Sequence, residues 1–336
     1  MAEIILKKTN RNIAIWLYIG VGMLVIQIVL GGITRLTESG LSITEWNPIT
    51  GALPPLNHAD WVTEFSKYKS TDQFRHIHAD FSLSDFKKIF FWEWLHRNWA
   101  RLMGLVFLVG FFYFLIKKQF KKDMIIPFVI LFLLGMIQGA IGWIMVASGL
   151  VPEKLFVDHI KLATHFITAL VLLCYTLWFA LSISVPSRMK MINEPLRKVT
   201  WAIVIVLFFQ LIYGAFMAGL HAATAAPTWK NFFDNKIAIQ FIHRGLAYTL
   251  LVLVIVWWIK AGKVSRSSLL LKTRFIPLVL IFLQAGLGIG AVLLSPYGNN
   301  LVWFGVAHQF VAILFLMSIV FMLYIIRSPL QRKRYF

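Results

Sequence analysis

The chain has 336 residues, of which 59% are hydrophobic and only 14% are charged. A water-soluble domain has nearer a quarter of its residues charged, so the composition excludes a soluble domain and predicts an integral membrane protein. A formal net charge of +19 would suggest nucleic-acid binding in a soluble protein, but in a membrane protein the placement of the cations matters more. We therefore expect no nucleic-acid partner.

Eight apolar runs have about the 20 residues that a helix needs to cross a bilayer. Each spanning segment must satisfy its own backbone hydrogen bonds, so all eight are predicted to be helices of an all-α membrane protein. The runs are Ile13–Ile33, Ile89–Ile116, Met124–Ser148, Phe156–Ile183, Val199–Leu220, Ile237–Ile259, Phe275–Leu294 and Val302–Ile326.

One connection, residues 34–88, is long, whereas the others are short. It is rich in turn-forming residues and mixed charge, for example in the segments 34–48 and 51–55. We expect this loop to form an ordered cap over the helices, with short helices of its own. Cys174, the single cysteine, lies outside it in an apolar run, so the sequence excludes a disulfide within the chain and a metal site built on several thiolates.

The charges are distributed unequally between the two sets of connections. One set, with the N- and C-terminal segments, carries 20 cations against three acids, Glu3, Asp123 and Glu194. The positive-inside rule then predicts cytoplasmic termini and an outer position for the long loop. No Arg- and Ser-rich transit segment precedes the first apolar run, so a bacterial plasma (inner) membrane is expected.

The apolar runs also repeat short motifs in order. The pattern predicts two four-helix halves in the same orientation, residues 1–185 and 186–336, with the long loop 34–88 in the first. The matching pairs are Gln27-Ile-Val-Leu-Gly-Gly with Gln210-Leu-Ile-Tyr-Gly-Ala, His96-Arg97 with His243-Arg244, Gln138-Gly-Ala-Ile-Gly with Gln284-Ala-Gly-Leu-Gly, and His165 with His308.

Four histidines occupy matching places near the outer ends of their helices. Each is followed four residues later by alanine, which leaves the helix surface below the imidazole nearly bare. Paired imidazoles without cysteine or carboxylate ligands at suitable spacing favour a bis-histidine haem over zinc. The alternatives are histidines that only pack between helices, or a proton relay. The four pairs are His96 and Ala100, His165 and Ala169, His243 and Ala247, and His308 and Ala312.

Glu93 stands three residues before His96 and therefore shares a helix face with it. A carboxylate at membrane depth is costly, so Glu93 is a candidate catalytic residue. At the matching place the second half has Gln240 beside His243. This difference suggests chemistry in the first half and electron transfer in the second.

Other polar residues near the outer ends have no single interpretation. Arg97, Arg101 and Arg244 are suited equally to haem propionates and to lipid headgroups. The loop residues His58, His76 and His78 are expected to be solvated, whereas His159 and His221 are open between a haem edge and water. The glycines that follow Gln138 and Gln284 are interpreted as helix-packing positions.

Four segments together resemble the heme A synthase family, over almost the whole chain from Ile13 to the eighth helix. They are Gly31-Gly-Ile-Thr-Arg-Leu-Thr-Glu-Ser-Gly-Leu-Ser, Glu93-x-x-His-Arg-x-x-x-Arg, Gln138-Gly-x-x-Gly-Trp-x-Met-Val-x-Ser-Gly-Leu and Gln240-Phe-x-His-Arg. The resemblance implies an oxidoreductase that converts the C8 methyl of heme O into the formyl group of heme A, for the biogenesis of cytochrome oxidase. It also implies that His96 and His165 hold the iron of the substrate heme O, and that His243 and His308 hold a resident haem b. Some members have a cysteine pair in the first outer loop, which this chain lacks.

A bis-histidine iron has no free position for dioxygen unless a ligand leaves. This favours oxidation of the macrocycle followed by addition of water, repeated twice, with Glu93 as a general base or as a charge that stabilises a developing cation. The rival hypotheses are a transmembrane di-haem b electron carrier, which gives Glu93 no task, and a metal or proton transporter, which leaves the alanines unexplained. The sequence identifies neither the electron acceptor nor the oligomeric state, and a homo-oligomer and delivery of heme O by heme O synthase both stay open.

Overall fold

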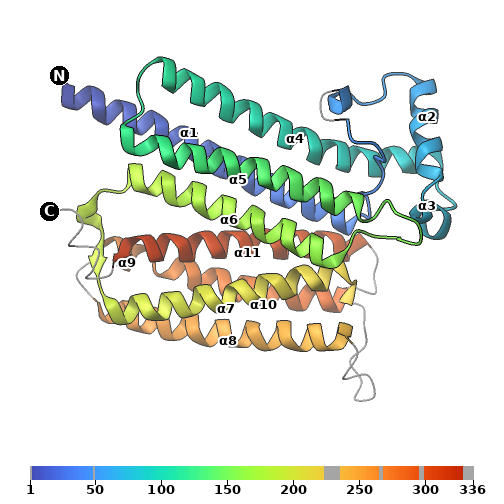
Figure 1. The fold of residues 1–336 in the computed structure, drawn as a ribbon. Coiled ribbons are helices and arrows are strands. Elements are labelled where there is room, and N and C mark those ends of the chain that lie inside the picture. The colour runs from blue at the N-terminus through green and yellow to red at the C-terminus, as the bar shows by residue number, and fades with distance from the viewer. Residues whose placement is uncertain (1, 48–49, 223–234, 265–267, 295–298, 328–336) are drawn as a thin grey trace.

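The computed structural model describes residues 2–47, 50–222, 235–264, 268–294 and 299–327. Almost all of this part is helical (Figure 1). In chain order its elements are α1 (Ala2–Leu36), η1 (Thr50–Ala52), α2 (His58–Lys69), α3 (Asp72–Ile77), α4 (Leu83–Ile116), α5 (Lys122–Ala147), α6 (His159–Ser184), η2 (Ser187–Met189), β1 (Met191–Ile192), α7 (Glu194–Gly219), α8 (Asn235–Lys263), α9 (Ser268–Thr273), α10 (Phe275–Leu294), α11 (Asn299–Ile325) and β2 (Ile326–Arg327).

Within the described residues, eight helices are long and apolar enough to cross a membrane, which confirms the predicted all-α membrane fold. Several helices begin earlier than their apolar runs because polar residues cap them. Ser82 and Asp85 form a reciprocal capping box that starts α4 at Leu83, six residues before the predicted start. Asn193 accepts a hydrogen bond from the Leu196 backbone and starts α7 in the same way.

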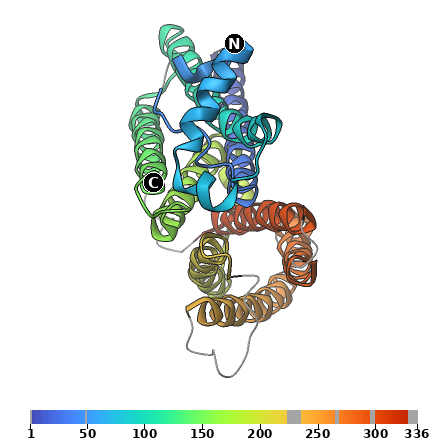
Figure 2. The same cartoon turned by 90° about the vertical axis from the view of Figure 1, so that its right-hand side faces the viewer.

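The long helices pack mainly on their neighbours in the sequence. α1 packs on α4 and α6, α5 packs on α6, α7 packs on α8, and α10 packs on α11 and α8. Figure 2 shows α7, α8, α10 and α11 side by side in a ring, next to the first four long helices. α6 contacts α7, and α1 contacts α11, so these helices join the two groups. The division of the chain at residue 185 and its origin as a repeat stay predictions.

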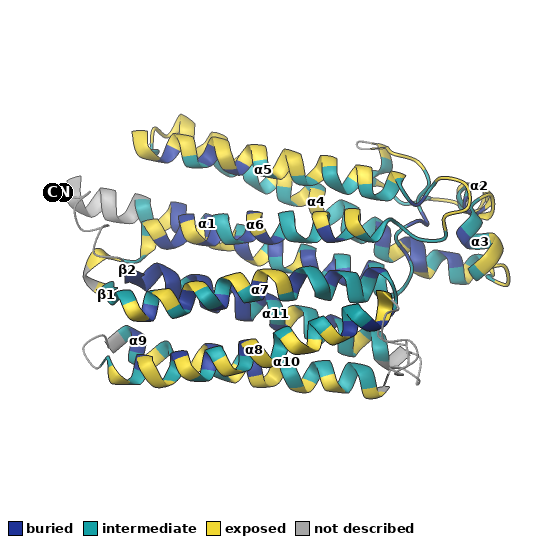
Figure 3. Ribbon diagram, turned by 60° about the horizontal axis from the view of Figure 1, so that its bottom comes forward, coloured by how far each residue is buried: buried dark blue, intermediate teal, exposed yellow. Residues whose placement is uncertain are grey.

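The burial of each long helix depends on its place in the two groups (Figure 3). The helices at the junction, α1, α6 and α11, are the most buried of the long helices, whereas α4 and α10 are the least buried. Their outer faces are covered with apolar side chains such as Phe112, Ile116 and Val279. In a membrane these faces meet lipid, which is as apolar as the side chains themselves.

The loop after α1 forms a folded cap, as predicted. Helix α2 packs against the first turns of α4 through a cluster of aromatic and aliphatic residues, and α3 packs on α2 through Phe74. The cluster consists of Phe65, Tyr68, Phe86, Ile89 and Phe90. Ala2 and Arg327, the two ends of the described chain, lie at the opposite end of the helices from this cap (Figure 1). The cap therefore lies over one end of the first four long helices, among them α4 and α6, which carry His96 and His165 (Figure 2).

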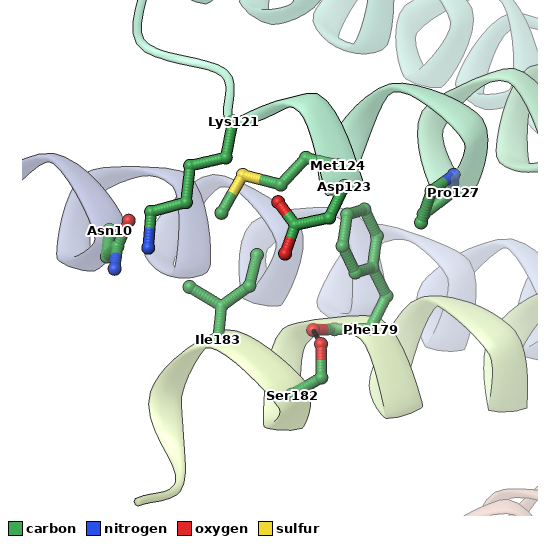
Figure 4. A pocket seen from close by; sticks show the side chains of 8 residues that line it. All are labelled: Asn10, Lys121, Asp123, Met124, Pro127, Phe179, Ser182 and Ile183. Carbon is green, nitrogen blue, oxygen red and sulfur yellow. Dashed lines mark hydrogen bonds between the residues drawn. The ribbon is translucent and has the colours of Figure 1, made fainter. Parts of the chain in front are cut away.

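A cavity of about 220 Å³ lies at the end away from the cap, between the N-terminal part of α5 and the C-terminal part of α6 (Figure 4). It is lined by Asn10, Lys121, Asp123, Met124, Pro127, Phe179, Ser182 and Ile183. It is separate from the histidines, which lie near the other ends of their helices.

Close packing of α1 on α4 generates a prediction about stability. The indole of Trp16 lies over Gly110, where a methyl group would overlap it, and the indole is held by a 3.2 Å hydrogen bond from its Nε1 to the Val106 carbonyl. We expect Gly110→Ala to lower the free energy of unfolding by ~1–3 kcal/mol, the usual cost of overpacking. Thermal unfolding in detergent measures this.

The control is Gly104→Ala on the same helix, since no atom lies within 4 Å of the added carbon there. Gly104→Ala should leave the unfolding temperature unchanged or raise it. Equal unfolding temperatures for the two variants would contradict the packing described here.

Candidate functional site

The four predicted histidines lie on four different long helices, α4, α6, α8 and α11. His243 and His308 face each other, with their ring centroids 6.4 Å apart and their planes at 63°. His96 and His165 lie on α4 and α6, two helices of the other group. The structure thus brings His243 and His308 together as one of the two predicted pairs.

The geometry of the second pair suits a metal held between two imidazoles. Bonds of about 2.0–2.1 Å from a metal to two opposed imidazole nitrogens separate the ring centroids by roughly 6 Å. Among the buried atoms of the described residues, His96 Nδ1 and His243 Nδ1 have no hydrogen-bond partner. A buried nitrogen without a partner is costly, and coordination to iron is one way to satisfy it. The residues therefore fit a haem between His243 and His308, and the unpartnered Nδ1 marks His96 as a further candidate ligand.

Glycines on the preceding helices make room for the imidazoles. A Cβ atom at Gly31 would lie 3.1 Å from His96 Cε1, and one at Gly142 would lie 2.7 Å from His165 Cε1. In the second half the corresponding distances are 3.3 Å for Gly214 and His243, and 2.9 Å for Gly288 and His308. The trailing glycines of the two predicted packing motifs, Gly142 and Gly288, are packing positions, but what they pack against is the histidines, whereas Gly139 and Gly286 face open space. The alanines are less uniform, since Ala100 is exposed whereas Ala169, Ala247 and Ala312 are half-buried.

Glu93 is buried on α4 and accepts three hydrogen bonds. Arg97 donates to its Oε1 at 2.6 Å, while the Ser42 hydroxyl and the Ile43 backbone N–H donate to its Oε2 at 2.7 and 2.8 Å. The carboxylate therefore joins three elements of the site: the helix of His96, a neighbouring cation, and the loop after α1.

Gln240 occupies the equivalent place on α8. Its Oε1 accepts a 2.9 Å hydrogen bond from Arg244, as Glu93 does from Arg97, and its Nε2 donates to the Ala222 carbonyl. The loop after α1 offers donors to Glu93, whereas the segment after α7 offers a carbonyl acceptor to Gln240. The exchange of acid for amide between the halves therefore has a structural explanation beside the catalytic one.

The arginines of α4 bind the cap. Arg97 donates to the carbonyls of Ile43 and Glu45, at 3.0 and 3.2 Å. Arg101 donates to the Asn47 carbonyl at 3.0 Å. This role is neither of the two considered from the sequence, because the partners are backbone oxygens of the protein.

A second polar cluster, which the sequence did not predict, joins the cap to the end of α7. Glu38 has a left-handed backbone (φ 55°), and its carboxylate lies 3.5 Å from both His78 Nε2 and His221 Nε2. Hydrogen bonds from His221 and His78 lower the pKa of Glu38 to about 2, so this carboxylate is ionised at neutral pH. Arg35 completes the cluster by donating to the carbonyls of Ala218 and Gly219.

The position of His78 corrects one expectation. His58 and His76 are exposed, as predicted for solvated loop residues, but His78 is buried and makes a 2.6 Å hydrogen bond with the Tyr68 hydroxyl. His159 packs on Phe216 at the start of α6. The only signal in the sequence was that Glu38 lies within the Gly31–Ser42 motif, which gave no indication of its partners.

Comparison with known proteins identifies one family over nearly the entire chain. Residues 14–320 match the model of a family described as cytochrome oxidase assembly protein. A protein named heme A synthase from Flavobacterium psychrophilum is 36% identical over 340 residues, which cover 94% of this chain and 98% of that protein. Heme A synthases from Flavobacterium johnsoniae and Rhodospirillum centenum are 36% and 37% identical and cover 95% of this chain, and 99% and 89% of their own lengths. This integral membrane protein therefore belongs to the cytochrome oxidase assembly protein family.

Proposed function

We propose that this protein is a heme A synthase, an oxidoreductase that converts the C8 methyl of heme O into the formyl group of heme A. The observation that carries the proposal is the similarity to heme A synthases over 94–95% of the chain. The four histidines support it, because they fall on the segments that the resemblance assigns to haem binding and because His243 and His308 face each other.

We assign different roles to the two pairs. His243 and His308 would hold a resident haem b, which passes electrons when bound. His96 and His165 would hold the substrate heme O. The position of the acid supports this assignment, since buried Glu93 stands one helical turn from His96, whereas Gln240 stands at the matching place beside His243.

The reaction consists of two oxidations with water. In the first, a C–H bond of the methyl group is broken and a C–O bond to water forms, with release of two protons and two electrons. In the second, another C–H bond is broken and a C–O bond to a second water forms, with release of two more protons and two more electrons, and the resulting diol loses water to give the formyl group. The electrons pass to an acceptor that the sequence does not identify.

Glu93 would act as a fixed negative charge beside the reacting carbon. Its two oxygens already accept hydrogen bonds from Arg97, Ser42 and Ile43, so the carboxylate is held in place before substrate arrives. A preorganised charge stabilises a cation that develops in the transition state. The same contacts make a general base less favourable, because taking a proton would require one of the three donors to move.

We further propose a bacterial plasma (inner) membrane, with cytoplasmic termini and with the haem sites toward the outer face. The excess of cations on the connections opposite the cap supports this orientation, and the relatives compared are bacterial. The partners would be heme O, membrane lipids, an electron acceptor, and heme O synthase where that enzyme delivers the substrate. A homo-oligomer is compatible with this proposal.

One observation favours a second candidate, a di-haem b electron carrier. The sequence left Glu93 without a task in such a carrier, but its contacts with Ser42 and Ile43 provide one, the attachment of the cap. Extraction of the pigments from the purified protein separates the two functions. Heme O, its alcohol or heme A beside haem b supports the synthase, whereas two equivalents of haem b alone support the carrier.

The first prediction concerns the ligands. His243→Ala and His308→Ala should each abolish haem b binding, because each removes one of two axial ligands. His96→Ala and His165→Ala should retain haem b with an unchanged low-spin spectrum and should lose binding of heme O. Pyridine haemochrome spectra and chromatography of the pigments measure both. Loss of haem b from His96→Ala and its retention in His243→Ala would reverse the assignment of the halves.

The second prediction tests the charge of Glu93 against its contact with the cap. Glu93→Gln should reduce heme A formation by ~10²-fold or more while both haems stay bound. Ser42→Ala removes one hydrogen bond to the carboxylate but keeps its charge. A hydrogen bond to a charged group contributes about 1.5–3 kcal/mol, and Ile43 and Arg97 still hold the carboxylate, so we expect a loss of activity of about tenfold, near the lower end of that range. Equal losses in the two variants would show that Glu93 serves the structure of the cap and not catalysis.

The third prediction concerns the source of oxygen. The alcohol intermediate trapped in Glu93→Gln or in a short reaction should contain oxygen from labelled water. We choose the alcohol for mass spectrometry because a formyl oxygen can exchange with solvent after it forms. Label from dioxygen in the alcohol would rule out the water mechanism whatever the effect of Glu93.

A further inference from the structure

Each of the four histidines lies beside a glutamine of the preceding long helix. In each case the glutamine stands four residues before the glycine that makes room for the same imidazole. The contacts join Gln27 Nε2 to His96 Nε2 (3.3 Å), Gln138 Nε2 to His165 Nδ1 (3.2 Å), Gln210 Nε2 to His243 Nε2 (3.3 Å), and Gln284 Nε2 to His308 Nε2 (3.0 Å).

Two of these four pairs have further partners that fix them. His308 Nδ1 donates to the backbone carbonyl of Gln284 at 3.1 Å, so this imidazole already has an acceptor from the main chain, although the side-chain Oε1 of Gln284 is buried without a partner. The Gln138 Oε1 accepts a 2.6 Å hydrogen bond from the Thr168 hydroxyl, which holds its amide N–H group toward His165. In neither pair is the imidazole oriented by the side-chain carbonyl of the glutamine.

The other two pairs, Gln27 with His96 and Gln210 with His243, have no such partner among the described residues. The Oε1 of each glutamine and the Nδ1 of each histidine are buried without a hydrogen bond. A half-turn of the amide exchanges its oxygen and nitrogen and puts a carbonyl oxygen at the imidazole nitrogen. That nitrogen then donates its proton to the glutamine, and the other nitrogen of the ring carries the lone pair.

A histidine that binds a metal almost always donates its second N–H to an acceptor, which fixes the tautomer and makes the ligand more basic. We propose that Gln210 is the positioning residue for His243, and Gln27 for His96, with the amide oxygen as this acceptor. The inference rests on the proposed haem ligands. It adds that one ligand of haem b, His243, is oriented by a replaceable side chain, whereas the other, His308, is oriented by a backbone carbonyl.

The test uses the full-length protein purified with haem b. Gln210→Met keeps the size of the side chain but removes the acceptor, and Gln210→Glu restores an acceptor. Gln284→Met is the matched control, because it changes the side chain beside His308 but leaves the backbone acceptor in place. The readouts are the affinity for haem b, the electron paramagnetic resonance g-values of the oxidised haem and its midpoint potential.

We expect Gln210→Met to weaken haem binding by roughly 10–100-fold, to shift the g-values and to raise the midpoint potential, since a less basic imidazole stabilises ferric iron less. Gln210→Glu should bring the affinity back to within a few-fold of the wild type and lower the potential. Gln284→Met should give the smaller shift in potential. If Gln210→Glu does not fold, the comparison of midpoint potentials tests the inference alone, and a larger shift in Gln210→Met than in Gln284→Met supports it.

Wild-type g-values, potential and affinity in Gln210→Met would overturn the inference, as would equal shifts in Gln210→Met and Gln284→Met. A different result, retention of haem b by His243→Ala, would contradict the proposed ligand assignment. Loss of haem b from His243→Ala together with an unaffected Gln210→Met would refute the role of the glutamine and leave the ligand assignment intact.

Discussion

The structure depends on the partners of one buried carboxylate. A charged side chain at the end of a membrane helix is costly unless its partners are close, and Glu93 has three, one from Arg97 and two from the cap. Because α4 also carries His96, these hydrogen bonds fix the cap relative to the helix that bears a candidate ligand. Folding of the cap and formation of the first histidine site are therefore linked.

Glu93 and Gln240 have the same arginine contact but opposite hydrogen-bonding needs toward the neighbouring loop. An arginine one turn beyond the acid or amide donates to it in both halves, at 2.6 Å for Arg97 and Glu93 and at 2.9 Å for Arg244 and Gln240. The neighbouring loop differs between the two places. Ser42 and Ile43, after α1, donate hydrogen bonds and so suit the acid Glu93, whereas the Ala222 carbonyl, after α7, accepts one and so suits the amide of Gln240. A residue that differs between two matching places is thus not catalytic for that reason alone, and the proposal for Glu93 rests on its charge and its distance along the helix from His96.

Much of the fold follows from hydropathy, because a membrane span needs a long apolar run and little else. The ends of α4 and α7 could not be predicted from hydropathy, since their first turns are polar and begin at Ser82 and Asn193. The four histidines could be found because their places repeat along the sequence. The cluster of Glu38, His78 and His221 could not, because its members lie up to 183 residues apart and meet only through the packing of the cap on α7.

The two halves differ most in what surrounds each imidazole, and this difference bears on their division of labour. His243 and His308 lie among glutamine amides, a backbone carbonyl and glycines, and within the described residues no carboxylate contacts them. Surroundings without a buried acid suit a haem that changes only its redox state. His96 has the same glutamine and glycine beside it, but one turn away the helix carries Glu93 with its partners already in place. A buried negative charge costs stability unless partners compensate it, and the partners of Glu93 also attach the cap. Beside a substrate that becomes positive during a reaction, the same charge would stabilise the transition state. This contrast between Glu93 and Gln240 is the structural basis for proposing chemistry beside His96 and electron transfer beside His243.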